Sequence, residues 1–216
     1  MDVPNSLLLS TKQKKQITVK GINGIKWNSS NSSVVSVSKN GTIYAKKTGN
    51  AVLIGTLGDL QLGCAVSVVT PARKRTVQKA IQIAKTCTYS QPKRMQEKFY
   101  DCSSLVWKSY HKNGVNFGMA NYAPVAADMG KWCAQHKKLV SGGLSQANIQ
   151  NMKLNPGDVM FETGQKNGRY KGIYHVEMIT GYIFYGFDGN GKAELGIQWA
   201  AGDEKYYPMG QMVGRP

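Results

Sequence analysis

Long apolar runs are missing from this sequence of 216 residues. A transmembrane helix needs about 20 consecutive apolar residues, and the longest runs here are short pieces such as residues 51–54. The sequence therefore predicts no membrane span. The N-terminus also lacks a basic segment followed by an apolar one, so we expect that any export signal has been removed or was never present.

Acidic residues are scarce: 12 Asp and Glu stand against 28 Lys and Arg, which gives a net charge of +16. Residues 1–70 carry eight basic and two acidic side chains, and residues 71–216 carry 20 and 10. Because the charge is spread over both parts, it does not form a discrete basic arm. It favours a polyanionic partner such as an anionic wall polymer. No helix-turn-helix, RNP-like or Cys/His finger pattern is visible, so we expect no nucleic acid partner.

Cysteines are too few and too scattered for a disulfide framework, since there are only Cys64, Cys87, Cys102 and Cys133. None of them forms a C-x-x-C pair. Cys133 and His136 have a C-x-x-H spacing, but a zinc site needs three or four ligands and no second pair lies nearby. We therefore expect no metal site and no cofactor.

Hydrophobic residues make up 41% of the chain, and its length suits one large domain or two small ones. The first 70 residues alternate between apolar and polar in short runs, a pattern typical of a small all-β sandwich. Asn40-Gly41 predicts a hairpin with a type I′ turn, in which both central residues need positive φ. The expected strands are residues 16–20, 24–27, 33–38, 51–54 and 64–69, with a turn at residues 21–24.

This N-terminal segment also resembles a known family. Residues 25–31, 34–37 and 40–51 are similar, in order and spacing, to the bacterial Ig-like domain of group 2, and the resemblance covers nearly all of residues 5–70. It implies a spacer or adhesive module on an exported bacterial protein. We interpret Trp27 as a core anchor of this domain rather than as a binding residue.

A boundary follows at residues 71–76, which we predict to be a charged linker after a strand ended by Pro71. The spacing of the apolar residues then changes from the alternation of a strand to the spacing of a helix. Apolar residues spaced i, i+3, i+4 and i+7 predict an amphipathic helix with Thr76 as its N-cap: Val77, Ala80, Ile81 and Ala84. The sequence thus predicts a domain at residues 1–70, the linker, and a second domain at residues 77–216.

Cys102 is the candidate nucleophile of the second domain. Residues 101–110 predict a helix with Asp101 as N-cap and Cys102 in the first turn. The helix dipole and the N–H groups at this end can lower the pKa of a thiol. A buried structural cysteine is the alternative interpretation.

His175 is the candidate base because it lies on a predicted strand, where a rigid backbone can hold its orientation. His175, Glu177 and Ile179 share one face of this strand, whereas Tyr174, Val176 and Met178 share the other. The other histidines are weaker candidates. We expect His111 in the last turn of the Cys102 helix, and His136 lies in a Lys-rich polar stretch.

Three segments of this second domain, in this order, resemble the NlpC/P60 family of cysteine peptidases: residues 99–106 with Asp101-Cys102-Ser103-Ser104-Leu105, residues 155–159 with Pro156-Gly157-Asp158, and residues 175–178 with His175-Val176-Glu177-Met178. The resemblance implies an α+β papain-like fold in which the cysteine helix packs against an antiparallel sheet. It also implies Cys102 as nucleophile and His175 as general base and acid. The Cys102 backbone N–H would stabilise the oxyanion.

The remaining site residues follow from the same resemblance. It places Tyr89, Asp101 and Ser103 at the substrate, with a loop-packing tyrosine as the alternative interpretation of Tyr89. It also implies a third catalytic residue, which we expect on the strand at residues 193–200. We assign Gln198 to that role because its amide oxygen can accept from an imidazole N–H. The alignment could instead put Trp199 there, with Glu177 as the fallback.

Two departures from the family pattern involve Ser104 and Glu177, which stand where the family usually or often has glycine. The hydrophilic segment 162–172 is expected as a loop near the cleft that selects substrate, or as a solvated hairpin tip. If Cys102 is free, the other three cysteines can form at most one disulfide within the chain.

The sequence therefore predicts a secreted or wall-associated bacterial hydrolase that cuts peptidoglycan stem peptides, typically between D-γ-glutamate and the diamino acid. A CHAP-type amidase or cross-bridge peptidase would use the same nucleophile and base. A third hypothesis is a wall-binding or adhesion module whose papain-like domain has lost its activity.

Overall fold

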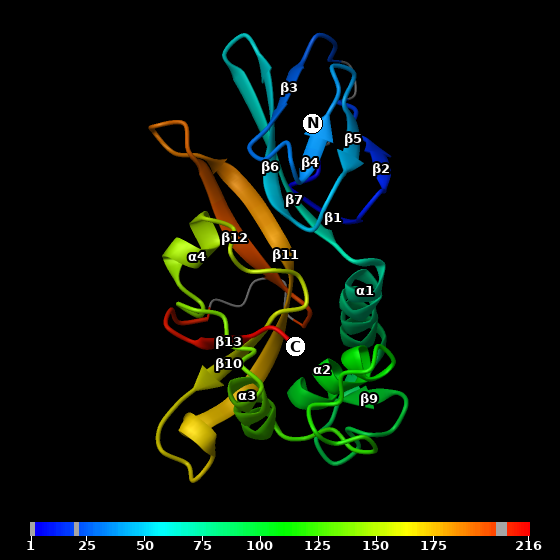
Figure 1. Ribbon diagram of the computed structural model, residues 1–216, viewed down its shortest axis with the longest axis vertical. Helices are drawn as coiled ribbons and strands as arrows, with labels where there is room; N and C mark the ends of the chain where they lie inside the picture. The colour runs from blue at the N-terminus through cyan, green and yellow to red at the C-terminus, as the bar shows by residue number, and fades with distance from the viewer. Residues whose placement is uncertain (1–2, 20–21, 202–206) are drawn as a thin grey trace. The chain divides into compact units, whose positions relative to one another are not determined.

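The computed structural model describes residues 3–19, 22–201 and 207–216, and the chain folds into two compact units (Figure 1). Unit 1 comprises Met1–Lys74, Ile149–Asn155 and Gly181–Gln198. Unit 2 comprises Arg75–Asn148, Pro156–Thr180 and Trp199–Pro216. Within the described ranges, no helix combines the length and the apolarity that a membrane crossing requires.

Unit 1 contains two small sheets. One has the strand order β1-β7-β6-β3, with β1 parallel to β7, and the other has the order β2-β5-β4. The bounds are β1 Ser6–Ser10, β2 Lys14–Gln16, β3 Lys26–Ser29, β4 Val35–Val37, β5 Thr42–Ala45, β6 Gly49–Leu57 and β7 Leu60–Val69. The predicted N-terminal Ig-like β domain is therefore confirmed.

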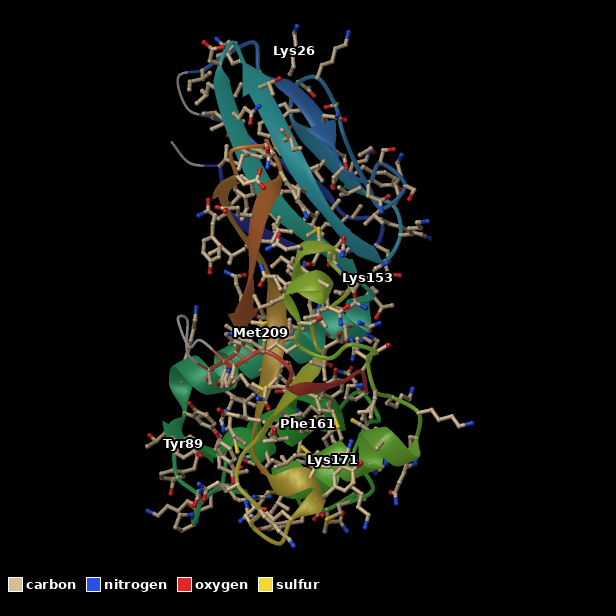
Figure 2. The ribbon with its side chains drawn as sticks, turned by 90° about the vertical axis from the view of Figure 1, so that its left-hand side faces the viewer. Lys26, Tyr89, Lys153, Phe161, Lys171 and Met209 are labelled. Carbon is tan, nitrogen blue, oxygen red and sulfur yellow. The ribbon has the colours of Figure 1, made fainter. Side chains whose placement is uncertain are left out.

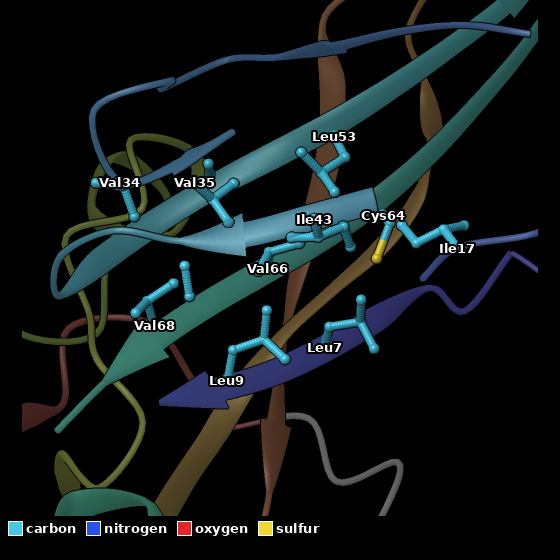
Figure 3. Packing of buried hydrophobic residues seen from close by; sticks show 12 residues of the cluster. Leu7, Leu9, Ile17, Val34, Val35, Ile43, Leu53, Cys64, Val66 and Val68 are labelled. Carbon is cyan, nitrogen blue, oxygen red and sulfur yellow. The ribbon is translucent and has the colours of Figure 1, made fainter. Parts of the chain in front are cut away.

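The core of this domain lies between the two sheets, where strand residues of alternating orientation meet (Figure 3). Leu9, Ile43, Leu53 and Val66 are each no more than 1% exposed. Burying one such aliphatic side chain stabilises a fold by about 1.5–3 kcal/mol. Trp27 is partly buried and packs against the same cluster, as expected of a core anchor.

Two local predictions in this domain need correction. The hairpin at Asn40-Gly41 forms, because β4 pairs with β5, but only Gly41 has positive φ (81°). The Gly41 N–H donates to the Ser38 carbonyl, so the loop has a type I turn followed by a left-handed glycine. Of the strand predicted at residues 16–20, only Gln16 belongs to β2. Lys20 and the start of the turn at Gly21 lie outside the described residues.

Unit 1 also includes segments from far along the chain. The second half of β11 (Ile173–Phe187) and the strand β12 (Ala193–Trp199) are neighbours in a sheet. The Phe184 N–H donates to the Asn5 carbonyl, and the Phe184 ring lies so close to Gly63 that a Cβ there would be 2.3 Å from it. Residues 181–198 therefore pack with the Ig-like strands, which differs from the predicted division at residues 70 and 77.

The first helix begins earlier than predicted. α1 spans Pro71–Thr86 and includes all of the expected linker. Proline suits the first turn of a helix, where its missing N–H is not needed, and Thr70 Oγ1 accepts from the Arg73 N–H at 3.2 Å. Thr76 lies inside the helix instead of capping it, and its buried hydroxyl oxygen accepts from Asn113 Nδ2 at 2.6 Å.

Unit 2 combines helices with short strands. In it, β10 pairs antiparallel with the first half of β11 and with β13, and the predicted Cys102 helix is confirmed as α2. The remaining bounds are β8 Thr88–Tyr89, β9 Phe99–Tyr100, α2 Cys102–His111, α3 Ala126–Gln135, α4 Gln146–Gln150, β10 Val159–Thr163, the 3-10 helix η1 Tyr170–Gly172 and β13 Met212–Gly214.

A buried ion pair connects the start of β10 to the end of the chain. Asp158, from the Pro156-Gly157-Asp158 motif, has no solvent exposure. Arg215 donates to both carboxylate oxygens, from Nε at 2.9 Å and from Nη2 at 2.7 Å. Such a bidentate pair has a fixed geometry, so it holds the C-terminal segment to β10.

We expect Arg215→Met to reduce the free energy of unfolding by about 3 kcal/mol, because it removes the cation that faces a buried carboxylate. Asp158→Asn retains an oxygen acceptor and should cost less, about 1–2 kcal/mol. Urea denaturation at neutral pH measures both. A larger loss for Asp158→Asn than for Arg215→Met would contradict this assignment.

Candidate active site

Cys102 is the first residue of α2, and the helix start is fixed by a complete capping box. The Ser104 N–H donates to Asp101 Oδ1 at 2.7 Å, and the Asp101 N–H donates back to Ser104 Oγ at 2.8 Å. The predicted N-cap is thus confirmed. Ser104 supplies the second half of the box.

The thiol of Cys102 is largely buried, and burial raises its pKa above the ordinary value. The negative charges of Asp101 and Glu177 act in the same direction. Hydrogen bonds from the Val176 and Ser103 backbones oppose them. Burial outweighs these backbone donors, so the net shift of the thiol pKa is upward, whereas the sequence suggested a lowered value.

His175 lies on β11 directly before Val176, whose backbone contacts the Cys102 sulfur. Its Nε2 atom lies 3.3 Å from the Tyr207 hydroxyl and 4.0 Å from Glu177 Oε2. The structure therefore brings Cys102 and His175, the two principal residues predicted from the sequence, into one cluster. Glu177, on the same strand face as His175, belongs to this cluster too.

Tyr207 is a member of the cluster that sequence reasoning missed. Its ring stacks on the His175 imidazole, with centroids 6.0 Å apart, and packs edge-on against Trp199 at 4.8 Å. Burial raises its pKa, and the charge of Glu177 adds to this shift, so the hydroxyl stays protonated. Tyr207 is in no helix or strand, so the sequence carries no periodic signal for it.

Glu177 is 3% exposed and held by backbone donors. Its Oε1 atom accepts from the Met178 N–H at 2.9 Å and from the Ala201 N–H at 3.4 Å. This leaves Oε2 as the carboxylate oxygen that faces the imidazole. The Glu177 carboxylate, on the same strand as His175, can therefore stabilise a protonated His175 imidazole.

Gln198, the residue predicted as the third catalytic group, belongs to unit 1. There its Oε1 atom accepts from Ser6 Oγ at 2.8 Å. The amide oxygen that would have oriented the imidazole is thus bonded within the Ig-like unit. Tyr207 and Glu177, both in the described part of unit 2, face His175 Nε2.

Tyr89, on β8, lies at the surface of unit 2 with 52% of its area exposed (Figure 2). Its ring packs edge-on against Tyr100. Partial burial raises the pKa of its hydroxyl, and the Cys102 thiolate raises it further, whereas a hydrogen bond from the Cys102 backbone opposes the shift. The predicted substrate residue therefore adjoins both the nucleophile and the helix N-terminus.

Asp101 and Ser103 bind a buried arginine that the sequence did not single out. Arg94 Nη1 donates to Asp101 Oδ2 at 2.9 Å and to Ser103 Oγ at 3.2 Å. Arg94 Nη2 donates to the Ala123 carbonyl, and the guanidinium lies over the Tyr122 ring. Both carboxylate oxygens of Asp101 therefore bind groups of the protein itself.

Unit 2 has two cavities in this region, and Cys102 lines the smaller one. One, of about 210 Å³, has Cys102, Asp101 and Ser103 in its wall. The other, of about 470 Å³, is bounded by α3 and by the segment 162–172, and Val125 and Arg169 line both. The hydrophilic segment 162–172 therefore contributes to the wall of the cavity that Cys102 lines, through Arg169.

The other histidines and cysteines have structural surroundings. His111 stacks on Trp107 and His136 on Trp132, with centroids 4.1 and 4.3 Å apart. All four cysteines are free thiols. Burial raises the pKa of Cys64 and that of Cys133 to about 12, so neither ionises near neutral pH.

Comparison with known proteins identifies the N-terminal part. Residues 8–68 match the family of bacterial Ig-like domains (group 2), a kind of domain typical of extracellular bacterial proteins. A similar solved structure is that of a bacterial Ig-like domain containing GH10 xylanase from termite gut. It is 22% identical over 30% of this chain and 18% of that chain, with a TM-score of 0.28. A search of curated proteins found no match.

The acidic surroundings of the thiol predict a pH-dependent reactivity. Alkylation of Cys102 by iodoacetamide should have a midpoint above the ordinary thiol value of about 8.5. Glu177→Gln removes a charge that disfavours the thiolate, so its midpoint should be lower. Mass spectrometry of the alkylated peptide across a pH series measures both midpoints. Glu162→Gln is the matched control and should leave the midpoint unchanged; an unchanged midpoint in Glu177→Gln would show that Glu177 does not act on the thiol.

Proposed function

We propose that the protein is a secreted bacterial cell-wall hydrolase, a cysteine peptidase that cuts peptidoglycan stem peptides. The observation that carries this proposal is the cluster of Cys102, His175, Tyr207 and Glu177 beside a cavity. A thiol at a helix start next to a histidine on a strand is the arrangement that nucleophilic catalysis requires. The three NlpC/P60-like segments and the extracellular type of Ig-like domain support the same function.

The fold of unit 2 is consistent with a papain-like assignment, which we make part of the proposal. α2 carries the cysteine at its N-terminus, and the antiparallel strands β10 and β11 carry the histidine. The Asp158 of the second motif is buried in its pair with Arg215. In this assignment that motif has a structural role, whereas the other two supply the reacting groups.

His175 acts first as a base in the proposed mechanism. In this mechanism the neutral imidazole carries its proton on Nε2, the nitrogen that faces Tyr207 and Glu177. Nδ1 then has the lone pair that accepts the thiol proton. Because the Cys102 pKa is raised, the thiolate forms as His175 removes this proton at the moment of attack, and Glu177 stabilises the resulting imidazolium.

The bond changes are those of acyl transfer. Cys102 Sγ attacks the carbonyl carbon of the scissile amide, and the oxyanion forms beside the Cys102 backbone N–H and the Tyr89 hydroxyl. His175 returns the proton to the leaving nitrogen as the C–N bond breaks. Water, deprotonated by His175, then attacks the thioester carbonyl, which releases a carboxylic acid and restores the thiol.

The test is digestion of purified peptidoglycan followed by mass spectrometry of the muropeptide products. We expect products cut between D-γ-glutamate and the diamino acid, and a loss of more than about 10³-fold in rate with Cys102→Ala. Cys87→Ala, at a partly exposed cysteine outside the cluster, should retain the activity.

Two results would contradict this proposal. Products cut between sugar and peptide, or within the cross-bridge, would assign a CHAP-type specificity to the same residues. Retained wall binding without hydrolysis in either protein would assign a binding module.

The positioning of His175 gives a second prediction. Tyr207→Phe keeps the ring contacts but removes the hydroxyl at Nε2, so kcat should fall about tenfold with little change in KM. Gln198→Ala should leave kcat within about twofold. Steady-state kinetics, with melting temperatures to confirm folding, separate the two; the reverse ranking would restore Gln198 as the orienting residue.

A further inference from the structure

Arg169 lines both the smaller cavity, which Cys102 borders, and the larger cavity beside α3. It is exposed, on the hydrophilic segment directly before η1. The Arg169 N–H donates to Asn167 Oδ1 at 3.0 Å, which helps to fix the backbone of the loop. Within the described ranges, no ion pair joins its guanidinium to an acidic residue.

The smaller cavity is lined by Asp101, whose negative charge is balanced by Arg94. Arg94 is 9% exposed and pairs with Asp101, so this carboxylate does not offer a free negative charge to a ligand. Arg94 Nε is buried and lacks a hydrogen-bond partner among the protein groups that the structure describes. Among the described residues that line this cavity, Asp101 is the acidic one, and its charge is balanced by Arg94.

The charges of the larger cavity also leave Arg169 unbalanced. Its wall contains Asp128 and Lys131, which are three residues apart on α3 and therefore neighbours on the helix surface. Their charges offset each other. An acidic side chain does lie near the smaller cavity, because Glu162 accepts a hydrogen bond from the Tyr174 hydroxyl. That carboxylate is engaged with a phenol, whereas Arg169 faces both cavities.

We propose that Arg169 binds a free carboxylate of the substrate in this groove and selects stem peptides by that group. The inference rests on the proposed function and deepens it. A γ-linked glutamate leaves its α-carboxylate free, separated from the scissile carbonyl by two methylenes and the α-carbon. A guanidinium is suited to such a group because it presents a planar fork of donors. Arg169 is then a specificity-determining residue rather than part of the reacting cluster.

The test uses the full chain with Cys102→Ala, so that peptides bind without being cut. Calorimetry compares L-Ala-D-γ-Glu-diaminopimelate with the same peptide in which the glutamate α-carboxylate is an amide. We expect the carboxylate peptide to bind about tenfold more tightly, the effect of one charge-assisted hydrogen bond. Adding Arg169→Gln should abolish this preference, and Arg169→Lys should retain part of it.

Lys166→Gln is the matched control, because it removes the same charge from the same loop at a residue that lines neither cavity. It should keep the tenfold preference. If Arg169→Gln discriminates between the two peptides as strongly as its parent, or if the parent binds both equally, the proposed subsite is wrong.

A second probe separates this inference from the proposed function. N-acetyl-D-glutamate is titrated into the chain while the backbone amides of Ser103, Ala126 and Gly168 are followed by NMR. Shifts that occur in the parent but not in Arg169→Gln support the anion site even if neither stem peptide binds, a result that would overturn the peptidase proposal alone. The absence of such shifts in the parent, or equal shifts in both proteins, would overturn the anion site.

Discussion

The Asp101 carboxylate is the interaction on which the candidate site depends. One of its oxygens caps α2 through the Ser104 N–H, and the other accepts from Arg94. The first bond sets where the helix begins, and so where Cys102 stands. The second bond holds the buried Arg94 guanidinium next to Asp101, so the charge of this carboxylate is balanced within the protein. A single buried group therefore fixes the position of Cys102 and contributes to the charge of the cavity around it.

The Ig-like domain could be predicted from the sequence because its information is local. Alternating side chains and a favoured turn dipeptide determine each strand, and residues 8–68 match the family model. The compact units could not be predicted in the same way. The contact between Phe184 and Gly63 joins segments more than 100 residues apart, and no periodicity encodes such a pair. Pro71 shows a related ambiguity, since proline suits a helix start as well as a strand end.

In the candidate site too, residues on regular elements could be predicted, whereas residues brought in by long-range contacts could not. Cys102, His175 and Glu177 lie on regular elements, so motif and face predicted their association. Tyr207 and Arg94 come from irregular segments, and their contacts arise only from the tertiary fold. Gln198 was chosen for its chemistry on a strand of the expected type. Its bond to Ser6 shows that suitable chemistry does not by itself determine the partner of a side chain.

The distribution of charge accounts for how such a site can work. Burial raises the pKa of the Cys102 thiol, the charges of Asp101 and Glu177 add to this shift, and Glu177 faces the His175 imidazole. In the proposed reaction, negative charge thus lies where the imidazolium would form, whereas the positive charge of Arg169 lies at the wall that both cavities share. In the proposal, a substrate carboxylate bound by Arg169 would not lie against the carboxylates of Asp101 and Glu177. Because the two charges are held by separate segments, β11 and the loop at residues 162–172, binding and proton transfer can be varied independently by substitution.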